Sequence, residues 1–119
     1  RDAAVAIIPS VARPTGGAWY EGTDLNALAK AAGIIEACFY EPSAARVLAD
    51  AWDVKRRIGD AGAIRGIMRA SHPDLNSAGE VAGAVAGLAA AGITDVAFYN
   101  FGFYRPRSFE WIRAAFEGT

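Results

Sequence analysis

The sequence has few of the residue types that would point directly to a function. It contains one cysteine, Cys38, and one histidine, His72, among 119 residues. A lone cysteine excludes a disulfide framework and a lone histidine excludes a multi-histidine metal site, so we expect no metal. The formal net charge is only -1, and the basic residues are spread along the chain. The basic residues therefore form no stripe along the sequence, which disfavours nucleic acid and anionic membranes as partners.

Long hydrophobic runs and targeting signals are also missing. No stretch approaches the roughly 20 apolar residues of a membrane-spanning helix, although a hydrophobic content of 53% is ample for a core. The N-terminus, Arg1-Asp2, lacks the charged start, apolar middle and cleavage site of a signal peptide. Because the chain starts without Met and directly on a predicted strand, we expect it to be a piece of a longer protein.

The sequence does contain a repeat of about thirty residues, the length of one βα unit. Four apolar segments rich in β-forming residues begin 30, 30 and 32 residues apart, at Ala4, Ile34, Ile64 and Val96. Each segment leads through a proline-containing loop into a stretch of helical periodicity. These stretches open near Asp24, Ser43, Ser77 and Ser108. Alternation of this kind predicts parallel strands with right-handed crossovers, hence an α/β fold of four consecutive βα units in one domain over residues 1–119.

The polarity of the strands distinguishes an open sheet from half of a barrel. Helices cover both faces of an open parallel sheet, so its central strands are apolar throughout. Here one strand face carries polar residues at two levels, which are Glu36, Arg65 and Asp95, and then Tyr40, Arg69 and Tyr99. An apolar outer face with a mixed interior is typical of a TIM barrel, so we favour half of a (β/α)8 barrel. The first of the two levels is interpreted as a structural ion-pair layer near the barrel floor.

Half a barrel leaves two parallel edges and an open interior, which is costly in unpaired backbone groups. Something must therefore close it. We expect either a missing N-terminal half or a second copy of the chain as the partner, unless the sheet closes in another way.

Ligands of parallel α/β proteins bind where strands end and helices begin. The loops at that end are rich in aromatic residues, with arginines and amides between them. The candidate ligand-binding residues are Arg13, Trp19, Tyr20, Tyr40, Arg69, His72, Tyr99 and Asn100. Aromatic rings stack on the apolar faces of sugars, and polar side chains bind their hydroxyls, so a carbohydrate or a similar small molecule fits this rim.

Three carboxylates at the same end are candidates for catalysis. Glu41 directly ends the second strand, where barrel hydrolases commonly keep a general acid or nucleophile. Glycoside chemistry needs a second carboxylate, which Glu21 or Asp74 could supply. The alternative is that Glu41 stabilises the start of the following helix or pairs with Arg69. His72 is either a general base or a loop residue bonded to the backbone.

The longest loop, residues 13–21, contains the glycine pair Gly16-Gly17. This pair has neither the Walker nor the GxGxxG order, so we expect no nucleotide cofactor, and no cofactor of another kind is indicated. The loop is either a lid that brings Trp19 and Tyr20 over a ligand or a flexible turn.

The last quarter of the chain resembles a known family. Asp95-Val-Ala-Phe-Tyr-Asn-Phe-Gly, followed by Pro106-Arg-Ser-Phe-Glu-Trp-Ile, is similar to the last βα unit of TIM-barrel proteins related to glycoside hydrolases. Ala89-Ala-Ala-Gly-Ile-Thr resembles the helix end that leads into that final strand. The resemblance implies that these four units are strands five to eight of a barrel. It also implies that an acid commonly placed on strand four is absent from this chain.

Three functional hypotheses follow. The first is a carbohydrate-binding or glycoside-hydrolase-like half-barrel, with Glu41 as the acid or nucleophile. The second is a non-catalytic half-barrel that assembles with a partner half or with itself. The third is a barrel enzyme acting on a phosphorylated metabolite held by Arg13, Arg69 or Arg105, which the absence of a glycine-rich phosphate loop after strands three and four disfavours.

Overall fold

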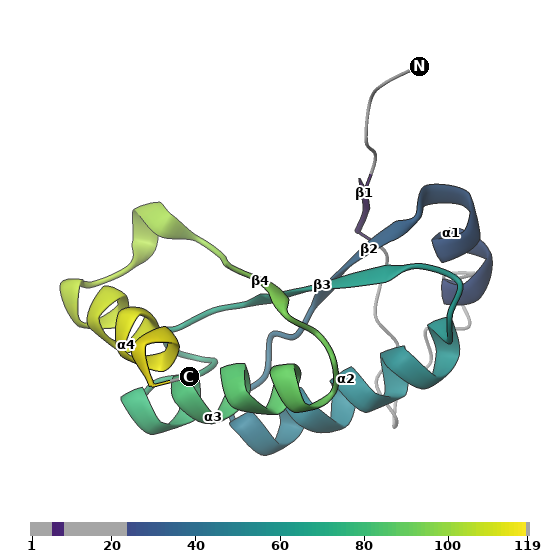
Figure 1. Cartoon of the computed structure of the whole chain (residues 1–119). Helices are drawn as coiled ribbons and strands as arrows, with labels where there is room; N and C mark the ends of the chain where they lie inside the picture. Colours follow the sequence, from purple (N-terminus) through teal and green to yellow (C-terminus); the bar gives the residue numbers. More distant parts are fainter. Residues whose placement is uncertain (1–5, 9–23, 119) are drawn as a thin grey trace.

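The computed structural model describes residues 6–8 and 24–118. Strands and helices alternate along this part of the chain. The elements are β1 (Ala6–Ile7), α1 (Leu25–Ala32), β2 (Ile34–Cys38), α2 (Ala44–Ile58), β3 (Ala63–Met68), α3 (Ala78–Ala90), β4 (Asp95–Phe98), a 3-10 turn η2 (Phe101–Phe103) and α4 (Pro106–Glu117). The strands form one parallel sheet in the order β1-β2-β3-β4 (Figure 1). The predicted α/β class with alternating βα units is confirmed.

The first three helices begin at the residues that the sequence indicated. The side chains of Asp24, Ser43 and Ser77 each accept a hydrogen bond from a backbone N–H in the first turn of α1, α2 and α3. Such caps satisfy N–H groups that have no partner within the helix. At the other end, Gly33 follows α1 with a φ of 84°, a left-handed conformation that glycine adopts without a steric penalty.

The fourth helix begins earlier than expected. We predicted its start near Ser108, but α4 begins at Pro106, with Arg105 in the N-cap position. Proline suits the first helical position, because its φ is already helical and the N–H that it lacks would have had no partner there. No side chain caps this helix, and its first turn contains no acidic residue.

A carboxylate ties α3 to α2. Ser77 and Glu80 have the spacing of a capping box, of which one half forms: the Ser77 hydroxyl accepts a hydrogen bond from the Glu80 N–H at 3.2 Å. The Glu80 carboxylate itself accepts a hydrogen bond from the N–H of Ala44, the first residue of α2. One acidic side chain thus satisfies the start of a neighbouring helix, which fixes how the two helices pack.

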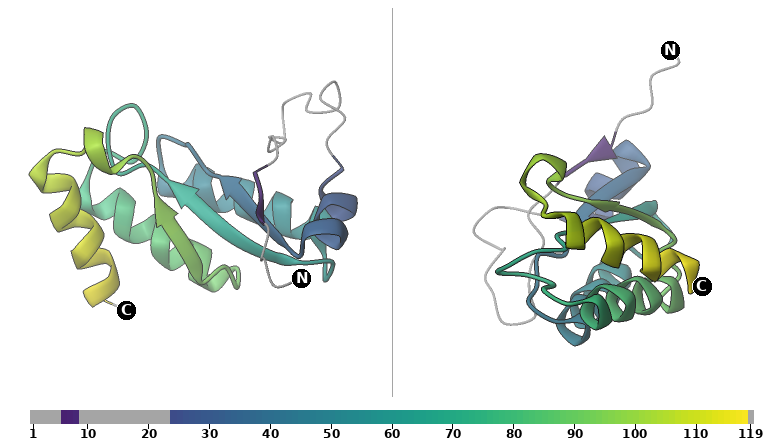
Figure 2. Two further views of the ribbon diagram at one scale, coloured as in Figure 1. Left: turned by 90° about the horizontal axis from the view of Figure 1, so that it is seen from above. Right: turned by 90° about the vertical axis from the view of Figure 1, so that its left-hand side faces the viewer.

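All helices lie on the same side of the sheet. Strands that follow one another in sequential order through right-handed crossovers place every connecting helix on one face. Figure 1 shows α2 and α3 side by side along that face, and Figure 2 shows α1 and α4 at opposite ends of it. Of the strand residues on this face, Ile35, Ala37, Phe39 and Met68 are fully buried, and they form the core together with the helices.

The sheet and α3 approach each other closely at Gly66 on β3. A Cβ atom at this position would lie 3.0 Å from Leu88 Cδ1 on α3 and 3.4 Å from the Phe39 ring. Leu88 and Phe39 are both fully buried. The absence of a side chain at Gly66 therefore lets α3 sit directly on the centre of the sheet.

The opposite face of the sheet is polar at the amino end of the strands. Arg65 lies between Glu36 and Asp95, its neighbours in the strand register. Its guanidinium nitrogens are 2.7 Å from Glu36 Oε1 and 3.0 Å from Asp95 Oδ2. Hydrogen bonds, first to Glu36 and then to Asp95, raise the pKa of Arg65. The expected ion-pair layer is therefore present.

None of the helices in residues 24–118 combines the length and apolar character that crossing a membrane would require.

Candidate ligand-binding site

Two tyrosines and an arginine lie together at the carboxyl end of the strands. Tyr40 follows β2, Arg69 follows β3 and Tyr99 follows β4, and their side chains occupy the polar face of the sheet. The Arg69 guanidinium carbon lies 4.3 Å from the centroid of the Tyr40 ring, a cation-π distance. The Tyr40 and Tyr99 ring centroids are 6.1 Å apart, with the planes tilted by 33°. The structure therefore brings three of the candidate ligand-binding residues into one cluster.

A buried carboxylate orients Arg69. Its Nε donates a hydrogen bond to Asp74 Oδ2, and Asp74 is only 6% exposed. The Asp74 backbone N–H donates to the Ser71 carbonyl at 2.8 Å, which closes the turn that follows β3. A guanidinium fixed by a carboxylate on one side can present its remaining N–H groups in a constant direction. Asp74 is therefore positioned as a support for Arg69.

Tyr104 links the ends of β3 and β4. Its hydroxyl donates a hydrogen bond to the Tyr99 carbonyl and accepts one from the Ala70 N–H at 3.0 Å. Burial raises the pKa of Tyr104, and burial together with a hydrogen bond to Cys38 raises the pKa of Tyr40. Both phenols are therefore neutral at physiological pH and act as hydrogen-bonding and stacking groups. The bridging role of Tyr104 depends on a long-range contact with Ala70, which the sequence does not reveal.

Glu41 turns toward the helix layer. Side chains of adjacent residues in an extended segment point to opposite faces, so Glu41 faces away from Tyr40. Only 2% of the surface of Glu41 is exposed. Its carboxylate oxygen Oε2 lies 3.1 Å from the Nε of Arg46, in the first turn of α2. This placement agrees with the alternative in which Glu41 stabilises the start of the following helix.

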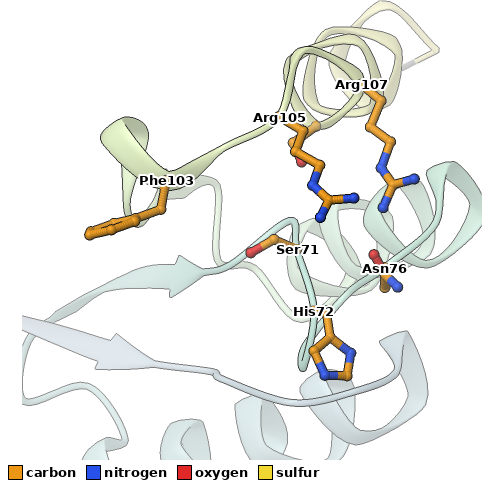
Figure 3. Close-up of a pocket in the computed structure, with 7 residues that line it drawn as sticks. Ser71, His72, Asn76, Phe103, Arg105 and Arg107 are labelled. Carbon is orange, nitrogen blue, oxygen red and sulfur yellow. The ribbon is translucent and has the colours of Figure 1, made fainter.

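A pocket lies beside this cluster, between the loop that follows β3 and the start of α4. Its volume is about 410 Å³. The loop contributes Ser71, His72 and Asn76, and the η2–α4 segment contributes Arg105 and Arg107. Figure 3 shows both guanidinium groups extending from the start of α4 toward the loop that carries His72 and Asn76.

Two further residues line the same pocket. Phe103 lies at its edge and is 82% exposed. Ser108 lies in the first turn of α4 and is 2% exposed. Asn100, another candidate, precedes η2 and accepts a hydrogen bond from the Phe103 N–H through its carbonyl at 3.0 Å. The peptide bond between Tyr99 and Asn100 is cis, as is the bond between His72 and Pro73.

Sequence analysis did not single out Asn76, Phe103, Arg107 and Ser108. One signal could have indicated Arg107. Arginines at positions 105 and 107 flank a proline that starts a helix, although helix starts favour acidic residues. A basic helix start without a carboxylate is a signal for an external anion.

Four candidates from the long first loop cannot be compared with this geometry. Arg13, Trp19, Tyr20 and Glu21 lie outside the described residues. Within residues 6–8 and 24–118, no group of three or more His, Cys, Asp or Glu side chains is placed to hold a metal ion.

No protein-family model, curated protein or solved structure matches the chain.

Proposed function

We propose that the chain is half of a (β/α)8 barrel that binds a carbohydrate at the carboxyl ends of its strands. The observation that supports this best is the sheet itself, whose four parallel strands follow one another in sequence order with the helices on one face. A doubly wound sheet would reverse its strand order and carry helices on both faces. The polar face of this sheet suits the interior of a barrel.

Closing the barrel needs a second set of strands. β1 and β4 are the edges of the sheet, and Ile8 on the polar face is 60% exposed. Exposed parallel edges are templates for further strand pairing. The proposed partner is a second half of the same kind, either from a longer polypeptide or from another copy of this chain.

Light scattering over a concentration series tests the association of two copies. We expect a dimer, because pairing of both edges would also cover the polar face. Ile67→Lys would place a charge in the middle of that face and is expected to give monomers. Ala82→Lys adds the same charge at an exposed position on α3 and serves as the control. A wild-type chain that remains monomeric at all concentrations would rule out closure by a second copy.

The cluster at the strand ends supports a sugar ligand. Tyr40 and Tyr99 offer ring faces for stacking, and Arg69 offers N–H groups for hydroxyls. Tyr99 is 51% exposed, so a ligand can reach its ring. Flat apolar surfaces beside fixed hydrogen-bond donors are the combination that sugar rings require.

Saturation-transfer NMR with a panel of mono- and oligosaccharides tests this proposal. We expect signal from at least one sugar, and its loss in Tyr99→Ala. Trp52→Ala removes an aromatic side chain of similar exposure, 50%, from α2 and is the matched control. Equal binding by Tyr99→Ala and wild type would contradict the proposed stacking role.

The geometry favours binding over hydrolysis. Glu41 and Asp74 are both buried, and each is engaged by an arginine. A glycosidase acid or nucleophile must contact the scissile bond. Any turnover of a bound glycoside should be measured for wild type and Glu41→Gln. Loss of turnover with retained binding would assign Glu41 to catalysis, and unchanged turnover would leave it a structural role at the start of α2.

A further inference from the structure

The pocket at the start of α4 carries positive charge that the described residues do not balance. The side chains of Arg105 and Arg107 both reach into it, and no carboxylate lines it. We infer that this pocket holds the oxyanion group of the ligand, a carboxylate or a phosphate, so that the preferred ligand is an acidic sugar. The sugar part of this inference rests on the proposed function, whereas the oxyanion part does not.

The other arginines of the described residues form ion pairs with carboxylates, and in this respect Arg105 and Arg107 differ from them. Ion pairs with carboxylates engage Arg46, Arg56, Arg57, Arg65, Arg69 and Arg113. Within the described part of the chain, Arg105 and Arg107 form none. The guanidinium of Arg107 lies 5.3 Å from the Trp111 ring centroid, a contact that limits its freedom. Two guanidinium forks at one site match the paired oxygens of a carboxylate or a phosphate.

The helix start adds to the positive potential at the pocket. α4 is 12 residues long, and it has neither a capping side chain nor an acidic residue in its first turn. Pro106 has no N–H group, and the N–H of Ser108 donates to the Arg105 carbonyl at 2.9 Å, so the contribution of this helix start comes mainly from the positive end of its dipole. That end of a helix favours a nearby negative charge.

Ser108 adds a hydroxyl to the lining of the pocket. The residue is 2% exposed and lies in the pocket wall. A hydroxyl can donate a hydrogen bond to an oxyanion. An oxyanion in the pocket would therefore accept a hydrogen bond from this side chain.

The size and charge of the pocket define the ligand class. Its volume of about 410 Å³ lies within the usual range for small-molecule sites, roughly 300–1,000 Å³. The formal net charge of -1 gives the chain no overall electrostatic attraction for a polyanion. Phe103 lines the edge of the pocket and is exposed, so its ring is accessible to the same ligand. The Tyr40–Tyr99 ring pair at neighbouring strand ends is also available to it.

Isothermal titration calorimetry with four ligands tests the inference: inorganic phosphate, glucose 6-phosphate, glucuronate and glucose. We expect at least one acidic sugar to bind more tightly than glucose. In the double variant Arg105→Gln/Arg107→Gln its affinity should fall about tenfold or more, as expected for the loss of charge-assisted hydrogen bonds. The control Lys30→Gln/Arg113→Gln removes two exposed charges elsewhere and should bind like wild type. Ser108→Ala should weaken binding by a smaller factor.

The outcomes separate this inference from the proposed function. If phosphate binds through the two arginines and no sugar adds affinity, the oxyanion site stands and the carbohydrate proposal fails. If glucose binds as well as the acidic sugars, and the double variant binds like wild type, the oxyanion site is overturned and the carbohydrate proposal stands. Absence of any anion binding would also overturn the oxyanion site. A preference for glucuronate or for glucose 6-phosphate identifies the oxyanion as a carboxylate or a phosphate.

Discussion

Gly66 provides a direct test of how α3 sits on the sheet. Substitution by alanine places a Cβ atom 3.0 Å from Leu88 Cδ1 and 3.4 Å from two atoms of the Phe39 ring. Both neighbours are fully buried, so neither can move away without disturbing the core. Overpacking of this kind costs about 1–3 kcal/mol. Replacing glycine within a strand returns about 0.5–1 kcal/mol through backbone entropy, so we expect a net destabilisation of about 1 kcal/mol.

Equilibrium unfolding in urea, followed by circular dichroism, measures this difference as a shift in midpoint at constant slope. Leu88→Val, which removes both Cδ atoms, is the second arm of a double-mutant cycle. It should cost about 1 kcal/mol for the lost methylene, and the double variant should cost less than the sum because Leu88 no longer obstructs the new methyl group. Gly79→Ala, with open space around its Cβ position, is the control and should stabilise α3 slightly. Additive costs, or a stabilised Gly66→Ala, would show that α3 does not lie on this strand.

Three further substitutions test contacts that order the site and the helix layer, each by the same unfolding measurement. Tyr104→Phe should cost about 1–2 kcal/mol, because two hydrogen bonds to the backbone are lost. Burial raises the pKa of Tyr104, so its stabilisation is complete below about pH 10 and falls as the pH rises through the raised pKa. The difference between wild type and variant should therefore shrink in that range, and a constant difference would contradict this cause. Glu80→Ala should cost about 1 kcal/mol, because the first N–H of α2 loses its charged acceptor, and an unchanged midpoint would disprove that cap. Asp74→Asn should cost about 1–2 kcal/mol, below the value for a fully buried pair because the Arg69 side chain is 33% exposed; a neutral effect would show that Asp74 does not orient Arg69.

Local signals in the sequence were sufficient to predict the α/β class and the alternation of strands and helices. Asp24, Ser43 and Ser77 mark helix starts through caps that involve only the next few residues. The repeat of about thirty residues places neighbouring strands side by side, and the alternation of polar and apolar residues within each strand indicates which side chains share a face. Glu36, Arg65 and Asp95, which pair in the sheet, are 29 and 30 residues apart. Neither kind of signal depends on the rest of the structure, which explains why both could be read without it.

The candidate site was harder to predict, because its geometry depends on long-range contacts. Glu41 and Tyr40 are adjacent in sequence, yet one turns toward α2 and the other toward the polar face of the sheet. The early start of α4 at Pro106 carries Arg107 into the pocket, whereas a start at Ser108 would have left it in a loop. Ser71 and Ser108 meet across the pocket although they are far apart in the chain. The composition of the chain and the spacing of its residues do not determine which distant residues come together in the fold.

The two ends of the strands differ in whether their arginines are paired with carboxylates. This difference separates arginines with a structural role from those that we propose to bind a ligand. At the amino end, Arg65 is paired with two carboxylates of neighbouring strands, so no guanidinium in this layer is left unpaired for an anionic ligand. At the carboxyl end, Asp74 neutralises Arg69, and only Arg105 and Arg107 remain without a carboxylate among the described residues. A ligand gains most from charges that are not yet paired with another group. Pairing, more than residue type, therefore indicates which of these arginines can recognise a ligand.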